Sequence, residues 1–94
     1  MELTFEWDER KATANFKKHK VSFEEAPTIF NDPLLLTFPD FDHSNGEQRQ
    51  LSIGQSVRGR VLIVVHTDRG NDIRLITGRK ATANERKVYE QGNF

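Results

Sequence analysis

An apolar run at residues 61–65 constrains the fold of this chain more than any other feature of its sequence. It is the longest apolar run in the chain and is apolar on both faces of an extended strand, which is typical of a strand at the centre of a sheet. The sequence DRGN at residues 68–71 predicts a turn, and residues 73–77 predict a strand that returns beside the first. These segments together predict a hairpin that forms the middle of an antiparallel sheet.

Alternation of apolar residues and helix-capping signals predict the remaining elements. Ser22 with Glu25, and Thr82 with Glu85, have the spacing of capping boxes that open helices. Pro27 lies beyond the first turn of the second helix, so that helix should be short, bent or partly 3₁₀. The predicted elements are a strand at residues 3–7, helices at 9–19 and 23–30, strands at 34–38, 49–57, 61–67 and 73–77, and a helix from 83 to about 91.

This order, β-α-α-β-β-β-β-α, predicts an α+β fold in which an antiparallel meander packs against two N-terminal helices and one C-terminal helix. The strand at residues 49–57 should bury one face, with Gly54 as a possible bulge. Residues 40–48 read as a polar loop with a tight turn at Asn45-Gly46. With 94 residues, 35% of them hydrophobic, the chain is expected to form one domain over residues 1–94.

The formal net charge is zero, but the two halves of the chain differ in sign. Residues 1–47 carry 5 basic and 10 acidic side chains, whereas residues 48–94 carry 9 basic and 4 acidic ones. This split favours a basic surface for an anionic ligand, unless folding interleaves the charges. The absence of cysteine excludes disulfide scaffolds and cysteine-based zinc sites and fits a reducing compartment. No signal-peptide pattern or stretch of transmembrane length is present, so a soluble cytoplasmic protein is expected.

Basic residues at the end of the hairpin are the first candidates for chemistry. Simple alternation puts Arg74 and Arg79 on opposite faces of their strand, but a bulge or turn at Gly78 would let both converge with Lys80. Guanidinium groups on a rigid sheet suit the recognition of phosphate and the stabilisation of charge at a phosphoryl centre. The alternative is that these residues are only a solvated face beside a helix start.

Proton-transfer candidates are fewer. His66 lies across the hairpin from Arg74 and can act as an acid, a base or a phosphate donor, or else be a satisfied core histidine. Glu90 and Tyr89 in the last helix can fold over the sheet, or be a surface acid and a half-buried aromatic. His19, near a helix end, is a weaker candidate.

Metal and cofactor chemistry have little support in the sequence. Asp40, Asp42 and His43 could hold a metal, but their spacing matches no strong metal motif, and a solvated loop is the simpler interpretation. A glycine-rich phosphate loop, HExxH and GxSxG are all missing, so hydride, ATP-dependent and serine-hydrolase chemistry have no support.

Four segments in their order resemble the BrnT family of bacterial toxins: FEWDERKATANFKKHKVSFEEA, LTFPDFDH, RQLSIGQSVRGRVLIVVHTDRG and IRLITGRKATANERKVYE. The resemblance runs from about residue 5 to residue 90. It implies a RelE-like fold and a ribonuclease that cuts RNA without a metal or other cofactor. It also implies a BrnA-like ribbon-helix-helix antitoxin as partner, through which alone the toxin would reach operator DNA, and no membrane partner.

Metal-free RNA cleavage normally uses the neighbouring 2′-hydroxyl as nucleophile, so the protein must supply proton-transfer groups and positive charge. On this resemblance we expect the catalytic residues to be Arg74, Arg79, His66 and Glu90. The residues expected to bind RNA are Lys80, Arg49, Arg60 and Tyr89, and we expect the antitoxin to shield Arg74 and Arg79. The alternative from a different class is a non-catalytic homologue that serves as co-repressor with a DNA-binding antitoxin.

Overall fold

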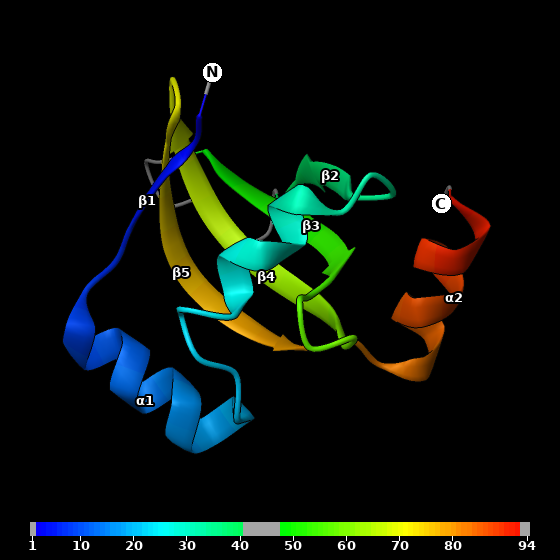
Figure 1. Ribbon diagram of the computed structural model, residues 1–94, viewed down its shortest axis with the longest axis horizontal. Helices are drawn as coiled ribbons and strands as arrows, with labels where there is room; N and C mark the ends of the chain where they lie inside the picture. Colours follow the sequence, from blue (N-terminus) through cyan, green and yellow to red (C-terminus); the bar gives the residue numbers. More distant parts are fainter. Residues whose placement is uncertain (1, 41–47, 93–94) are drawn as a thin grey trace.

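The computed structural model describes residues 2–40 and 48–92, in which five strands form one sheet in the order β1-β5-β4-β3-β2 (Figure 1). The elements are β1 (Thr4–Glu6), α1 (Glu9–His19), the 3₁₀ helix η1 (Ala26–Asn31), β2 (Leu36–Pro39), β3 (Arg49–Gln55), β4 (Val61–Arg69), β5 (Asp72–Lys80) and α2 (Ala83–Gln91). The predicted α+β class is therefore confirmed. The helices of these segments are all too short or too polar to span a lipid bilayer.

The central strand is β4, as its two apolar faces predict. It pairs antiparallel with β3 on one side and with β5 on the other. The β4–β5 connection is tighter than the predicted four-residue turn, because only Gly70 and Asn71 lie between the two strands. Gly70 has φ +62°, a left-handed conformation that a glycine adopts without a Cβ clash.

The sheet is mixed rather than purely antiparallel, which corrects the predicted meander. β1 pairs in parallel with β5, with Thr4 opposite Asp72 and Glu6 opposite Arg74. Alternation along a strand predicts which face is buried but not which strand becomes its neighbour. β1 covers only the first three residues of β5, so the remainder of that edge needs another partner.

Helix α1 supplies that partner. Asp8 caps its start by accepting from the backbone N–H of Arg10 at 2.8 Å, and Lys20 ends it in a left-handed conformation with φ 60°. The buried side-chain amide of Asn15 then contacts the backbone of Gly78 twice: its Oδ1 accepts from the Gly78 N–H at 3.1 Å and its Nδ2 donates to the Gly78 carbonyl at 2.8 Å. Asn15 therefore takes the place of a neighbouring strand at this position.

The second helix is short and 3₁₀, as predicted, but it begins at Ala26 instead of residue 23. Pro27 therefore falls in its first turn, where the missing N–H is not needed. Ser22 Oγ accepts from the Glu25 backbone N–H at 3.0 Å, which is half of the predicted capping box. The Glu25 carboxylate turns instead toward Ser56 Oγ at 2.7 Å and toward the guanidinium of Arg60.

Burial of β3 differs from the prediction of a one-face strand. Ser52 is fully buried, whereas Val57, the last residue of the predicted strand, is 78% exposed and lies beyond the end of β3. Gly54 forms no bulge and pairs in register with Leu62. A Cβ at Gly54 would lie 3.0 Å from the Cβ of Ile29, so the glycine allows η1 to pack closely on the sheet.

Strand β2 begins later than predicted, because Leu34 is 65% exposed in the turn before it. Pro39 belongs to the strand, opposite Gln50, instead of ending it. The turn predicted at Asn45-Gly46 lies outside the described residues.

Apolar side chains pack on both sides of the sheet. The side facing η1, called here the η1 face, carries Leu62, Val64 and Leu75 against Val21, Phe23, Ala26 and Ile29. The opposite side, called here the arginine face, carries Ile53 and Ile63 against Tyr89 of α2. In Figure 1, η1 crosses in front of the sheet, and α1 and α2 lie at opposite ends of the sheet. α2 covers only part of the arginine face, and the remainder is open.

Candidate active site

A β-bulge in β5 determines which basic side chains share a face. Val65 pairs with Thr77 and His66 with Leu75, which leaves Ile76 as one extra residue on β5. Alternation is therefore reset at Ile76. The sequence left open a bulge at Gly78, but the structure has it two residues earlier.

The reset brings Arg74 and Arg79 to the same side of the sheet. Arg74 pairs with Thr67 and Arg79 with Ile63, and Thr67 and Ile63 have the same parity along β4. An unbroken strand would have put Arg74, Ile76 and Gly78 on one face. That expectation is wrong, because the extra residue puts Gly78 on the face opposite to Arg74. Both arginines lie on the arginine face.

An open cavity of about 420 Å³ lies on this face beyond α2. Its lining residues are Asp40, Arg49, Leu51, Ile63, Val65, Ile76, Thr77 and Arg79. The floor is aliphatic and the charged groups at its rim are two arginines and one carboxylate. An apolar floor with a few charged groups matches the usual composition of a ligand site.

Arg79 is held at the rim by the first turn of α2. Its Nη1 and Nη2 donate to the Glu85 carboxylate at 2.8 and 2.9 Å, while the same carboxylate accepts from the Thr82 N–H at 2.8 Å. The hydrogen bond from Arg79 lowers the pKa of Glu85 to about 2 against an opposing effect of burial, and the same bond raises the pKa of Arg79. The Arg79 side chain is 37% exposed, so the N–H groups that Glu85 does not use can reach an anion in the cavity.

Arg49 and Asp40 face each other across the β2–β3 pair, where the Asp40 N–H donates to the Arg49 carbonyl at 2.9 Å. In register, Thr67 lies between Arg49 on one side and Arg74 on the other. Its hydroxyl is buried and has no hydrogen-bond partner among the described residues. The Arg74 side chain is 40% exposed, and its Nη1 lies 3.5 Å from Oε1 of Glu6.

His66 lies on the opposite side of the sheet. It is fully buried on the η1 face, with its Nε2 2.8 Å from Ser52 Oγ and its Nδ1 2.5 Å from Asp68 Oδ1. The ring of Phe30 packs edge-on to it at 5.1 Å. The expected convergence of His66 with Arg74 is wrong, because His66 shares the parity of Leu62 and Val64 while the bulge turns Arg74 away.

Two expected RNA-binding residues also lie away from the cavity. Lys80 is exposed but pairs with Leu62, so it leaves the sheet on the η1 face. Arg60 makes an ion pair with the buried Glu25 and donates to the Lys20 carbonyl at 3.1 Å. The hydrogen bond from Arg60 lowers the pKa of Glu25, although burial opposes it.

The α2 candidates divide in the same way. Tyr89 is 8% exposed and its hydroxyl donates to Asp32 Oδ2 at 2.5 Å. Burial and this hydrogen bond raise the pKa of Tyr89 to about 12, so its role here is to anchor α2 to the end of η1. Glu90, the next residue, is exposed on the helix surface.

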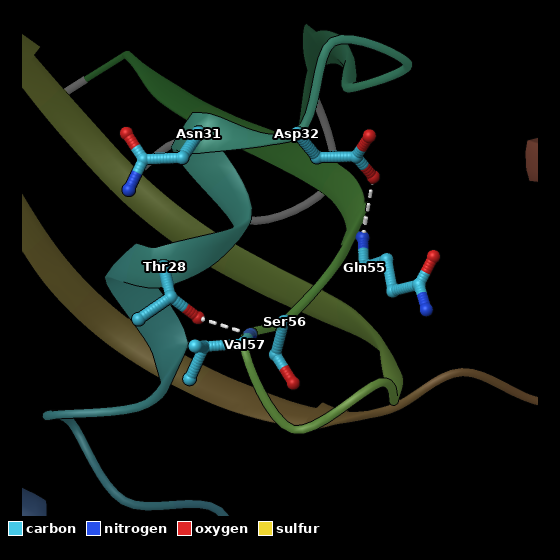
Figure 2. Close-up of a pocket in the computed structure, with 6 residues that line it drawn as sticks. All are labelled: Thr28, Asn31, Asp32, Gln55, Ser56 and Val57. Carbon is cyan, nitrogen blue, oxygen red and sulfur yellow. Dashed lines mark hydrogen bonds between the residues drawn. The ribbon is translucent and has the colours of Figure 1, made fainter.

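A second depression, of about 290 Å³, lies between η1 and the end of β3 (Figure 2). Its polar groups are already used by the fold: Thr28 Oγ1 accepts from the Val57 N–H at 2.9 Å and Asp32 Oδ2 accepts from the Gln55 N–H at 2.7 Å. Arginine and lysine are missing from its lining, so it is a poorer site for an anion than the cavity on the arginine face.

The metal loop considered from the sequence involves Asp40, Asp42 and His43, of which the last two lie outside the described residues. Within residues 2–40 and 48–92, His, Asp and Glu side chains do not form a group of three that could hold a metal ion.

Of the cavity's lining residues, only Arg49 and Arg79 were among the site residues predicted from the sequence. Asp40, Thr77 and the aliphatic floor, which includes the bulged Ile76, were missed. Asp40 was considered only as a loop ligand, and its position follows from the β2–β3 pairing, which alternation does not predict. The sequence held one signal for the bulge. Unbroken alternation would put Arg79 on the same face as apolar residues of its strand, where a charged side chain is not expected.

Comparison with known proteins shows the family of this chain. Residues 7–85 match the family described as "Ribonuclease toxin, BrnT, of type II toxin-antitoxin system". The chain belongs to the BrnT family. The match covers most of the chain, so the resemblance found in the sequence is confirmed, and the family description implies a ribonuclease toxin with an antitoxin partner.

A solved structure shares the fold of this BrnT-family chain. The 1.1 Å crystal structure of the Brucella abortus ribonuclease toxin BrnT superposes with a TM-score of 0.64, at 22% identity, over 87% of this chain and 97% of that one. At this identity the likeness supports the fold. A search of curated proteins found no match.

Proposed function

We propose that this chain is a metal-independent endoribonuclease toxin whose active site is the cavity on the arginine face. The observation that carries the proposal is the bulge at Ile76, which sets Arg79 and Thr77 on the same face as Arg49 around an open cavity. Family membership supports ribonuclease activity, and the geometry supports this cavity over the buried surroundings of His66.

The two cavity arginines suit the charge that develops during RNA cleavage. When the 2′-oxygen attacks phosphorus, negative charge grows on the non-bridging oxygens, and guanidinium groups fixed beforehand stabilise it more than water does. Arg79 is fixed by Glu85 and Arg49 by its position on β3 opposite Thr67. Arg74 stands farther along the same face and supports an adjacent phosphate.

We assign the proton acceptor to Asp40, the carboxylate that lines the cavity with Arg49 and Arg79. The 2′-hydroxyl gives its proton to Asp40 as the O2′–P bond forms, the P–O5′ bond breaks, and the 5′-oxygen takes a proton from solvent. The products are a 2′,3′-cyclic phosphate and a 5′-hydroxyl end. Glu90, exposed on α2, remains the reserve base predicted from the sequence, and His66 acts on the fold instead.

The proposed partner is a BrnA-like ribbon-helix-helix antitoxin in the cytoplasm, where RNA and operator DNA are both present. We propose that it covers the open part of the arginine face, because filling the cavity at Arg49 and Arg79 is the direct way to stop cleavage. Operator DNA would then contact the antitoxin and not this chain.

The test is cleavage of a defined RNA by the purified chain in the presence of EDTA, with the new ends analysed chemically. We expect cleavage to persist and to yield cyclic phosphates. Asp40→Asn should reduce the rate by about 10²–10⁴-fold, the range of general acid–base catalysis. Loss of cleavage on chelation, or an Asp40→Asn rate equal to wild type, would contradict the proposal.

A second candidate function is a non-catalytic co-repressor. It is favoured by the ion pairs of the free chain, in which Arg79 is bound to Glu85 and Arg74 lies near Glu6. If both arginines serve only the fold, the isolated chain should leave RNA intact while its complex with the antitoxin still binds operator DNA.

A further inference from the structure

We propose that the face of α1 carrying Lys11 and Lys18 is a track for the RNA backbone that continues from the cavity on the arginine face. This inference rests on the proposed function and names where the RNA strand runs once it leaves the cavity.

The track begins where two hollows share the bulge of β5. A second groove, of about 310 Å³, lies between α1 and β5, and Lys11, Ala14 and Lys18 line it. Ile76 and Thr77 line both this groove and the cavity that contains Arg49 and Arg79. An RNA strand that leaves the cavity over Thr77 therefore enters the groove directly.

Helix α1 is held rigidly beside this groove. Asn15, in the middle of the groove wall, is bonded to the backbone of Gly78 and also donates to the Val21 carbonyl at 2.9 Å. Lys11 and Lys18 flank Asn15 four residues before it and three after it, so they project from the same helical face. The clamp therefore fixes the helix face that carries the two lysines beside β5.

Both lysines are available to bind phosphate. They are exposed, and neither makes an ion pair with a residue in the described segments. Between the two lysines the groove is lined in part by small side chains, those of Ala14 and Thr77, which leave room for a ligand. An extended phosphodiester backbone can thus lie in the groove with a lysine at each end.

The chemistry favours RNA over a protein partner at this place. Cores of protein–protein interfaces are enriched in aromatic residues and depleted in lysine, and the groove has the opposite character. The exposed aromatic residue of α1, Phe16, lines a different hollow on the other side of the helix with Lys17.

The helix provides a matched control. Arg10 and Lys17 are exposed, are seven residues apart like Lys11 and Lys18, and neither lines the groove. The double variants Lys11→Ala/Lys18→Ala and Arg10→Ala/Lys17→Ala therefore remove the same charge from the same helix at different faces.

The experiment measures binding of the full chain to a labelled single-stranded RNA of about 12 nucleotides, a length within the usual site sizes of single-strand binders. The RNA carries 2′-O-methyl groups, which block the nucleophile and prevent cleavage. Fluorescence anisotropy gives Kd at several salt concentrations for wild type, the two double variants and Arg49→Ala. Thermal unfolding confirms that each variant is folded.

For Lys11→Ala/Lys18→Ala we expect a Kd about tenfold weaker and a salt slope smaller by about 1.4, which corresponds to two lost phosphate contacts on a single strand. The control pair should change both quantities much less. Equal effects of the two pairs would overturn the track in favour of a general charge effect.

Other outcomes separate the track from the proposed function. If Arg49→Ala weakens binding and Lys11→Ala/Lys18→Ala does not, the track is wrong while the active site stands. If the lysine pair alters only antitoxin binding, the groove belongs to the protein partner and the RNA assignment is overturned. If wild type binds no RNA, both proposals fail.

Discussion

At the scale of the residue, His66 shows how a chemically capable side chain can be fully used by the fold. Both ring nitrogens have partners, Ser52 on β3 and Asp68 on its own strand, and Phe30 covers the ring. Nothing on the arginine face can reach it through the sheet. Arg74 and Arg79, on either side of the bulge, keep part of their surface in solvent, which is the condition for binding a substrate.

We predict that His66→Ala lowers the free energy of unfolding by about 2–4 kcal/mol, because it leaves a cavity under Phe30 and removes one of the two hydrogen-bond partners of the buried Ser52 hydroxyl. Urea denaturation measures the change. Asp68→Ala, which removes a side chain that is 39% exposed, should have a smaller effect. A His66→Ala protein as stable as wild type would show that the histidine does not support the core.

At the scale of the element, two helices fix the strand that carries the site. α1 clamps β5 just after the bulge through Asn15, and the first turn of α2 holds Arg79 through Glu85. The strand that lines one side of the cavity is thus held by elements from both ends of the chain. The bulge sets the direction of the side chains, and the helices prevent the strand from slipping back into regular register.

We predict that Asn15→Ala lowers the free energy of unfolding by about 2–4 kcal/mol, because it leaves buried backbone groups of Gly78 and Val21 without partners. Equilibrium unfolding in urea, followed by circular dichroism, is the measurement. Asn84→Ala, at an exposed position of α2, is the control and should change little. Equal stability of the two variants would exclude the clamp.

The capping pair of α2 should make stability sensitive to acid. The Glu85 pKa falls from an ordinary 4.5 to about 2 in the folded chain, so its charged form stabilises the fold above pH 4.5. That contribution is lost as the pH falls toward 2. Glu85→Gln should therefore be less stable than wild type at neutral pH, and the difference should shrink across this window.

Urea denaturation at several pH values and constant ionic strength tests this. Glu90→Gln changes an exposed acid of the same helix and should stay close to wild type at every pH. A difference between Glu85→Gln and wild type that stays constant down to pH 2 would mean that Arg79 does not stabilise the charged carboxylate.

At the scale of the whole molecule, the sequence was sufficient for the class of fold and the central strand. The run at residues 61–65 and the capping box at Thr82 and Glu85 act locally, so pattern alone predicts them. The parallel pairing of β1 with β5 depends on contacts between residues far apart in the chain, which local patterns do not encode.

The site was predictable in part for the same reason. Arg49, Arg74 and Arg79 were identified by residue type, but their common face depends on one extra residue at Ile76 that resets the alternation. Asp40 joins them only through the β2–β3 pairing. The molecule therefore has one face used for packing against η1 and another that combines packing against α2 with an open, basic cavity.

The central claim is that the cavity on the arginine face is where RNA is cleaved. The most direct measurement is the single-turnover cleavage rate of one RNA by wild type, Arg49→Ala and the control Arg58→Ala, which removes an arginine whose side chain is 66% exposed and does not line the cavity. We predict a loss of about 10²–10³-fold for Arg49→Ala, as for removal of one group that stabilises transition-state charge. Arg58→Ala should cleave close to the wild-type rate, and an Arg49→Ala rate equal to that of Arg58→Ala would contradict the account.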